Sequence, residues 1–136
     1  MNILEYNLNN EKVQYLINSD KKLGKLIKFI RSSKLILEPD GFKCLVKYII
    51  GQQISDKARE TIWKRFCTNC GDVTPKIILS IDDIKLKKLG LSERKVEYIK
   101  TLATAIVNHE IDFNSFLNLT NEEIIKKLTS LKGIGR

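Results

Sequence analysis

The segment Thr120-Asn121-Glu122-Glu123-Ile124-Ile125-Lys126-Lys127-Leu128-Thr129-Ser130-Leu131-Lys132-Gly133-Ile134-Gly135-Arg136 predicts a capped helix that leads into a glycine-containing loop. Thr120 and Glu123 have the spacing of a capping box, in which the threonine hydroxyl accepts from the Glu123 N–H and the glutamate reaches back to Thr120. Apolar residues then recur at helical spacing, at Ile124, Ile125, Leu128 and Leu131.

The loop Leu131-Lys132-Gly133-Ile134-Gly135-Arg136 has the composition of a phosphate-binding hairpin. Gly133 and Gly135 allow backbone conformations closed to residues with a Cβ, and they let the main chain approach a ligand closely. The N–H groups of the loop can then converge on a phosphate oxygen. An ordinary helix C-terminus with Gly133 at the C′ position has the same sequence, so both interpretations stay open on these residues alone. In a helix-hairpin-helix a second helix follows at once, and we expect this chain to lack it.

The composition indicates one small, basic domain. The chain has 136 residues, of which 43% are apolar, with a formal net charge of +8 and a mean hydropathy of −0.18. Positive charge favours a polyanionic partner. No run approaches the roughly 18 apolar residues of a membrane span, and the N-terminus lacks the pattern of a signal peptide. We therefore expect a single, incomplete domain over residues 1–136, no membrane partner, and a cytoplasmic, nucleoid-associated location.

The hydrophobic period is helical almost throughout, and no alternating strand pattern competes with it. A central helix is predicted where apolar residues recur at i, i+3, i+4, i+7 and i+8, at Phe42, Leu45, Val46, Ile49 and Ile50. Helix-capping residues precede other periodic segments at Asp20, Ser55, Thr74, Ser92 and Thr120. The expected fold class is all-α, a compact multi-helix array that ends in a helix-hairpin-helix without its second helix.

The three cysteines suit a reducing compartment. Cys67 and Cys70 have C-x-x-C spacing, but a zinc or iron–sulfur site needs four ligands, and the other candidates are Cys44 and His109. Cys44 falls within the apolar central helix and is assigned to the core. We favour thiols at a helix end that bind no metal, and we predict neither a metal nor a cofactor.

Two aromatic side chains, Tyr48 and Trp63, can in principle line a ligand pocket. Both stand at helical spacing among apolar residues. This spacing is typical of a packed core, so both are assigned to the core and neither to the site.

Three segments, taken in order, resemble the helix-hairpin-helix glycosylase superfamily, and most closely its 3-methyladenine DNA glycosylase II branch. They are F-K-C-L-V-K-Y-I-I-G-Q-Q-I-S at residues 42–55, L-G-L-S-E-R-K at 89–95 and L-T-S-L-K-G-I-G-R at 128–136. The resemblance implies a base excision repair enzyme that flips a damaged nucleotide out of the stack and cuts its N-glycosidic bond. The expected partner is double-stranded damaged DNA, and the expected lesions are alkylated bases of the 3-methyladenine type, removed by hydrolysis.

The resemblance implies roles for particular residues. Gln53 matches the wedge that fills the gap left by the flipped nucleotide, with Gln52 as its neighbour, because a glutamine offers the orphaned base a donor and an acceptor. Without the resemblance, both amides would satisfy backbone groups at the break between two helices. Arg94 and Lys95 are expected phosphate contacts. The hairpin matches the backbone anchor, which positions the protein without reading sequence, through Leu131, Lys132, Gly133, Ile134, Gly135 and Arg136.

The resemblance also implies a catalytic aspartate beyond the hairpin, and no residue of this chain matches it. Asp72, Asp82, Asp83 and Asp112 all precede the hairpin. We therefore expect a chain that is truncated at the hairpin and inactive as given. We leave open whether the enzyme only hydrolyses the glycosidic bond or also has lyase activity. The alternatives are a non-catalytic helix-hairpin-helix module that binds DNA, and a helical interaction domain whose loop binds nothing.

Missing helices after the hairpin would leave apolar residues uncovered, among them Ile124 and Leu128. An exposed apolar patch of more than roughly a few hundred Å² usually leads to association. We therefore expect the chain to self-associate or to exchange a terminal helix, which light scattering at high protein concentration measures. A monodisperse monomer would contradict this expectation.

Overall fold

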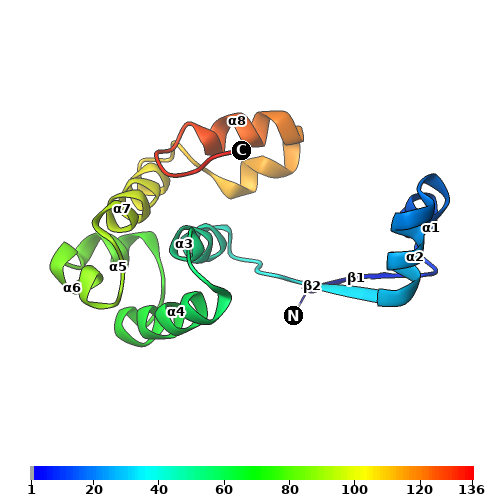
Figure 1. The fold of residues 1–136 in the computed structure, drawn as a ribbon. Coiled ribbons are helices and arrows are strands. Elements are labelled where there is room, and N and C mark those ends of the chain that lie inside the picture. The colour runs from blue at the N-terminus through cyan, green and yellow to red at the C-terminus, as the bar shows by residue number, and fades with distance from the viewer. Residues whose placement is uncertain (1) are drawn as a thin grey trace. The chain divides into compact units, whose positions relative to one another are not determined.

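The computed structural model describes residues 2–136, which form two compact units. The N-terminal unit runs to Pro39, and the C-terminal unit runs from Asp40 to Arg136 (Figure 1). The prediction of a single domain is not decided by this division and stays a prediction.

The N-terminal unit contains a two-stranded antiparallel sheet and two helices, and the helices separate the two strands in the sequence. Its elements are β1 (Asn2–Asn7), α1 (Glu11–Ser19), α2 (Lys21–Ile30) and β2 (Ser32–Leu37). Leu4 of β1 lies opposite Leu35 of β2. The two helices pack closely, because a Cβ on Gly24 would lie 2.6 Å from the carbonyl oxygen of Ile17. The side chain of Asp20 caps α2, as predicted.

The two strands correct the expectation that the chain contains no strand pattern. Apolar residues in β1 and β2 are adjacent, as in Ile3-Leu4 and Leu35-Ile36, and do not alternate with polar ones. A strand with one buried face is recognised by alternation of period two, which these segments lack. All six residues of β2 are exposed. The two segments become strands by pairing with each other across the intervening helices, which is a non-local interaction.

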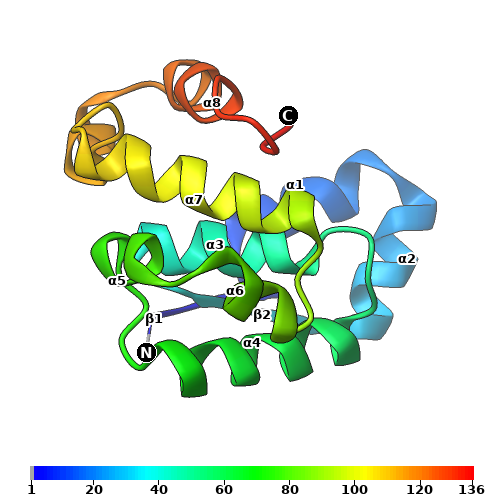
Figure 2. The same cartoon turned by 90° about the vertical axis from the view of Figure 1, so that its left-hand side faces the viewer.

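The C-terminal unit is helical, as predicted, and its helices are short. They are α3 (Gly41–Gly51), α4 (Asp56–Cys70), α5 (Pro75–Ser80), α6 (Asp83–Lys88), α7 (Glu93–Val107), the 3₁₀ helix η1 (Phe113–Asn118) and α8 (Asn121–Thr129). Helix α3 packs against both α4 and α7, and α5 packs against α7. Figure 2 shows α8 beyond α7, on the side away from α4.

The core of this unit forms around α3 and α7. Buried side chains on α3 are Phe42, Val46, Ile49 and Ile50, and those on α7 include Val96, Ile99, Leu102 and Ala103. The central helix predicted from the apolar period is therefore confirmed. Trp63 packs against this core as predicted, with its ring stacked on Phe66 at a centroid separation of 6.0 Å.

Two assignments to the core are wrong, and the helical phase explains both. Cys44 is exposed, and Tyr48 is 56% exposed. Phe42, Val46 and Ile49 mark the buried face of α3. Cys44 lies about 200° from Phe42 around a helix of 3.6 residues per turn, and Tyr48 lies about 200° from Val46. Both side chains therefore point away from the core, although each stands among apolar neighbours in the sequence.

The predicted helix caps are confirmed. The hydroxyls of Ser55, Thr74 and Ser92 accept from the backbone N–H three residues ahead, at the first turns of α4, α5 and α7. At α8 both halves of the capping box are present, because the Thr120 N–H donates to Glu123 at 2.8 Å and the Glu123 N–H donates to the Thr120 hydroxyl at 3.4 Å. The helix that leads into the glycine loop therefore begins where the sequence predicts.

Replacing Ile99 by alanine tests the core. Its side chain is 0% exposed on α7, so we expect I99A to lower the free energy of unfolding by about 2–5 kcal/mol through lost burial and a residual cavity. The matched control is I84A on α6, where the isoleucine is 63% exposed and a loss within about 0.5 kcal/mol is expected. Denaturant unfolding measures both. Equal losses in the two variants would contradict this core.

Candidate nucleic-acid interface

The turn between α3 and α4 presents Gln53 in a strained backbone conformation. Helix α3 ends at Gly51, Gln52 is its C-cap, and Gln53 has a φ of 58°. A residue other than glycine in this left-handed region costs about 1–3 kcal/mol, and such residues persist only where surrounding structure holds them. The Gln53 side chain is exposed. The predicted wedge residue therefore projects from a turn whose conformation needs support.

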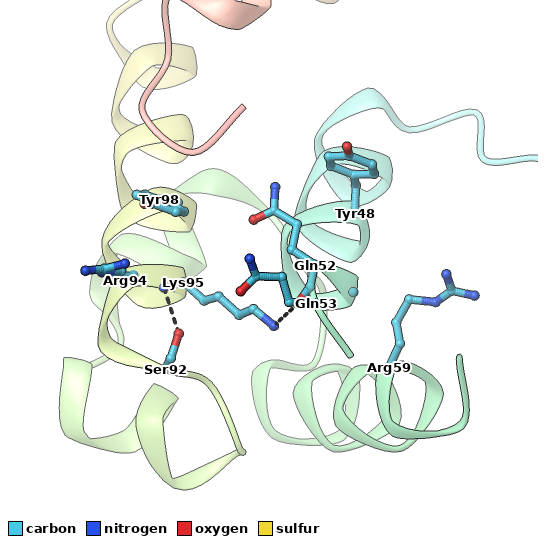
Figure 3. Close-up of a pocket in the computed structure, with 9 residues that line it drawn as sticks. Tyr48, Gln52, Gln53, Arg59, Ser92, Arg94, Lys95 and Tyr98 are labelled. Carbon is cyan, nitrogen blue, oxygen red and sulfur yellow. Dashed lines mark hydrogen bonds between the residues drawn. The ribbon is translucent and has the colours of Figure 1, made fainter. Parts of the chain in front are cut away.

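Lys95 supplies hydrogen bonds to that turn. Its ammonium group donates to the carbonyl oxygen of Ile50 at 2.7 Å and to that of Gln52 at 2.9 Å. The last carbonyls of a helix have no partner within the helix, so an outside donor satisfies them. Partial burial lowers the pKa of Lys95. In Figure 3 the Lys95 side chain reaches toward the turn, whereas the Arg94 guanidinium points away from it.

The predicted phosphate role of Lys95 therefore competes with an internal one. Two of the three N–H donors of the ammonium already bond to carbonyl oxygens. Arg94 is exposed and makes no ion pair among residues 2–136. Of the two predicted phosphate contacts, Arg94 is the one whose cation is available to a ligand.

The two glycines of the loop play different structural roles. Gly133 has a φ of 90°, and a Cβ there would clash with the ring of Tyr98. Gly135 has no positive φ, and a Cβ there would meet open space. Of the two glycines, Gly133 therefore uses a conformation closed to residues with a Cβ, and Gly135 does not. Because α8 ends at Thr129 with Ser130 as its C-cap, Gly133 also lies beyond the C′ position of an ordinary helix end.

A hydrogen bond joins the glutamine turn to the glycine loop. The side-chain amide of Gln52 donates to the carbonyl oxygen of Gly133 at 2.8 Å. Gln52 thus has the alternative role, in which the amide satisfies a backbone group. That group is the carbonyl of Gly133 in the hairpin, and not a group at the break between α3 and α4. Gln53 keeps its side chain exposed. The two predicted DNA-contacting elements, 81 residues apart in the chain, are in direct contact.

A cavity of about 530 Å³ lies at this junction (Figure 3). Its lining residues are Tyr48, Gly51, Gln52, Gln53, Arg59, Ser92, Arg94, Lys95 and Tyr98. Of these residues, Arg59, Ser92 and Tyr98 were not assigned to a site from the sequence, and Tyr48 was assigned to the core. Helical spacing offered one usable signal, because Tyr98 stands three residues after Lys95 and so shares its face of α7.

Carboxylates neutralise the basic side chains of the hairpin. Lys132 donates to Glu97 at 2.5 Å, and this contact raises the pKa of Lys132. Arg136 bonds both carboxylate oxygens of Glu122, at 2.8 and 3.0 Å. All four side chains are about half exposed or more. A phosphate that approached these cations would exchange with a solvated carboxylate, and would not meet an unpaired charge.

The C-x-x-C pair shows no metal-site geometry. Cys67 is partly buried and Cys70 is buried on α4, and burial raises the pKa of both thiols. Within residues 2–136 no group of three or more candidate ligands is close enough to hold a metal ion. No helix within residues 2–136 has the length and the hydropathy of a membrane span.

This geometry agrees with the comparisons to known proteins. The family model of the HhH-GPD superfamily of base excision DNA repair proteins matches residues 46–134, and the chain belongs to this family. The sequence is 30% identical over 130 residues to the alkylbase DNA glycosidase-like protein mag2 of Schizosaccharomyces pombe, covering 90% of this chain and 61% of that protein. The resemblance drawn from the three sequence segments is thereby confirmed.

Solved structures of 3-methyladenine DNA glycosylases share the fold. The DNA-3-methyladenine glycosidase of Bacillus halodurans superimposes with a TM-score of 0.81 at 28% identity, covering 97% of this chain and 62% of that one. The 3-methyladenine DNA glycosylase of Schizosaccharomyces pombe, in complex with abasic DNA, gives 0.79 at 28% identity, covering 93% and 65%. The chain thus spans less than two thirds of the length of these relatives.

Alanine at each glycine separates a conformational role from a ligand role. We expect G133A to lower the free energy of unfolding by about 1 kcal/mol or more, because of its positive φ and the Tyr98 ring. We expect G135A to leave stability unchanged and to weaken DNA binding about tenfold, because the Cβ blocks backbone approach to a phosphate. Thermal unfolding and fluorescence anisotropy measure these effects. Unchanged affinity and salt dependence in G135A would argue against a phosphate at this loop.

Proposed function

We propose that these residues belong to a DNA glycosylase of base excision repair that flips alkylated bases of the 3-methyladenine type out of duplex DNA and hydrolyses the N-glycosidic bond. The proposed partner is double-stranded damaged DNA. The Schizosaccharomyces pombe relative is described in complex with abasic DNA. Extruding a nucleotide costs a few kcal/mol, and the cost is least where damage already weakens stacking or pairing.

The observation that carries this proposal is the hydrogen bond from Gln52 to Gly133. It joins a turn that projects an exposed glutamine to a loop built to approach a phosphate. An enzyme that flips a nucleotide needs the wedge turn and the phosphate-binding loop at a fixed distance from each other, because the wedge must enter the base stack while the loop holds the DNA backbone nearby. A module that only binds the backbone has no use for the wedge turn.

The proposed roles follow from this arrangement. The hairpin, residues 131–136, grips the backbone and reads no sequence. Gln53 enters the stack, where its amide can donate to and accept from the orphaned base. Arg94 adds a salt-dependent phosphate contact. Gln52 is assigned a link to the hairpin rather than a contact to DNA.

No aspartate among these residues is assigned the catalytic role. Each of the seven already serves the fold. Asp20, Asp40, Asp82 and Asp112 cap helices, and Asp56, Asp72 and Asp83 pair with Arg59, Lys43 and Lys100. We therefore propose that these residues by themselves bind damaged DNA without excising the base, and that the catalytic carboxylate of the enzyme is not among them.

A second candidate function is a non-catalytic DNA-binding module that uses the hairpin alone. The carboxylate pairs of Lys132 and Arg136 fit either function. The two functions differ in whether binding responds to a gap in the stack, since only a wedge benefits from one.

Binding to abasic duplex DNA tests the proposal. We expect the chain to bind a duplex with an abasic-site analogue at least about tenfold more tightly than the same intact duplex, because the cost of unpairing and unstacking is spared. The Q53G variant removes the wedge and accommodates the positive φ, so it should fold normally and lose this preference. Fluorescence anisotropy at fixed salt measures both affinities.

The outcomes are distinct. Equal affinity for the two duplexes in the unmodified chain would leave only the non-catalytic module. Absence of DNA binding at low salt would remove both functions and leave a helical interaction domain. A preference that survives in Q53G would contradict the wedge role of Gln53.

A further inference from the structure

We propose that Lys95 is a positioning residue that holds the α3–α4 turn so that Gln53 projects as a wedge, and that α7 thereby sets the separation between the wedge and the phosphate-binding loop. This inference rests on the proposed function. It differs from the role expected from the sequence, in which Lys95 contacts a phosphate.

The contacts of Lys95 lie on the N-terminal side of the strained residue. Its ammonium donates to the carbonyl of Ile50, three residues before Gln53, and to that of Gln52, directly before it. The backbone of Lys95 is itself fixed, since its N–H donates at 3.3 Å to the hydroxyl of Ser92 at the start of α7. The lysine therefore bridges a rigid helix terminus and a turn whose middle residue has a φ of 58°.

The placement of the ammonium is electrostatically favourable. The C-terminal end of a helix carries partial negative charge on its unpaired carbonyl oxygens, which attract a cation. A charged donor also makes stronger hydrogen bonds than a neutral one. Lys95 is partly buried, and its bonds to Ile50 and Gln52 are shielded from solvent in part. This shielding preserves the strength of both bonds.

A second residue of α7 serves the glycine loop. Tyr98 places its ring where a Cβ of Gly133 would stand, so the loop packs against this ring. Lys95 and Tyr98 are three residues apart and so share one face of the helix. One face of α7 thus supports the wedge turn through Lys95 and the hairpin through Tyr98. The Gln52 amide also bonds to the Gly133 carbonyl, so the wedge turn and the hairpin contact each other as well as α7.

Positioning and phosphate binding predict different effects of removing the charge. A lysine that contacts a phosphate releases a counterion, so its loss flattens the dependence of log K on log salt by about 0.9. A lysine that bonds only to protein carbonyls leaves this slope unchanged. Its loss should instead reduce discrimination between abasic and intact DNA, because the wedge is no longer held.

The binding experiment compares three methionine variants of α7. In K95M the preference for the abasic duplex should fall about tenfold with an unchanged salt slope, since a charged hydrogen-bond donor is lost. In R94M the slope should flatten by about 0.9. K100M is the matched control, because Lys100 also donates to a backbone carbonyl, that of Ile81 at 2.8 Å, away from the turn. It should keep the preference.

A stability measurement tests the same inference without DNA. We expect K95M to lower Tm by about 5 °C. In a Q53G background the loss should be less than half as large, because glycine adopts the positive φ without help from Lys95. The control pair is K100M in the two backgrounds, where the losses should be equal. If K95M alone does not fold, the K95M/Q53G double variant should fold.

Each result decides the inference. A K95M variant that keeps the abasic preference, or whose salt slope flattens as in R94M, overturns it. Equal Tm losses in the two backgrounds, or a double variant that does not fold, also overturn it. If the unmodified chain shows no abasic preference, the proposed function fails, whereas the coupling between Lys95 and Gln53 in Tm still tests the positioning role separately.

Discussion

The ammonium of Lys95 between the carbonyls of Ile50 and Gln52 is the contact around which the candidate interface is built. The end of a helix leaves carbonyl oxygens without partners, and here that end lies beside a cavity. A charged donor from α7 satisfies them. The turn that follows can then hold Gln53 in a conformation that a glutamine seldom adopts.

The apolar core of the C-terminal unit holds in place the two helices, α3 and α7, that carry the candidate interface. Ile49 and Ile50 are fully buried at the end of α3. Val96 and Ile99 are fully buried on α7, where they directly follow Lys95 and Tyr98 in the sequence. Close-packed interiors resist displacement of their elements. The two helices that carry the interface are therefore held by the same apolar contacts that stabilise the fold, while their polar side chains face the cavity.

The basic side chains of the hairpin form exposed ion pairs with carboxylates. The formal net charge is +8, yet Lys132 and Arg136 are each paired with a glutamate on a solvated surface. Exposed pairs of this kind are weak and are screened by salt. In the proposed function, a phosphate that reaches the hairpin therefore replaces a weakly bound carboxylate. The chain belongs to the HhH-GPD superfamily of base excision DNA repair proteins.

The sequence by itself determined what depends on neighbours a few residues apart. The capping box of Thr120 and Glu123, the buried face of α3 and the family segments were all readable, because caps and helical periods are local. The pairing of β1 with β2 was not readable, since its hydrogen bonds join segments on either side of two helices. Cys44 and Tyr48 were misplaced because they were assigned by their apolar neighbours and not by the helical phase, which turns both away from the buried face of α3.

Only the tertiary structure decided what the site residues do. Lys95 reads as a surface cation, and its bonds to Ile50 and Gln52 connect residues more than forty positions apart. Gln52 and Gly133 meet across 81 positions. The fold requires a glycine at position 133 because of its φ and the ring of Tyr98, whereas it sets no such requirement at Gly135. Local patterns specify where the helices form, but the donors and acceptors left over at their ends find partners only when the helices pack.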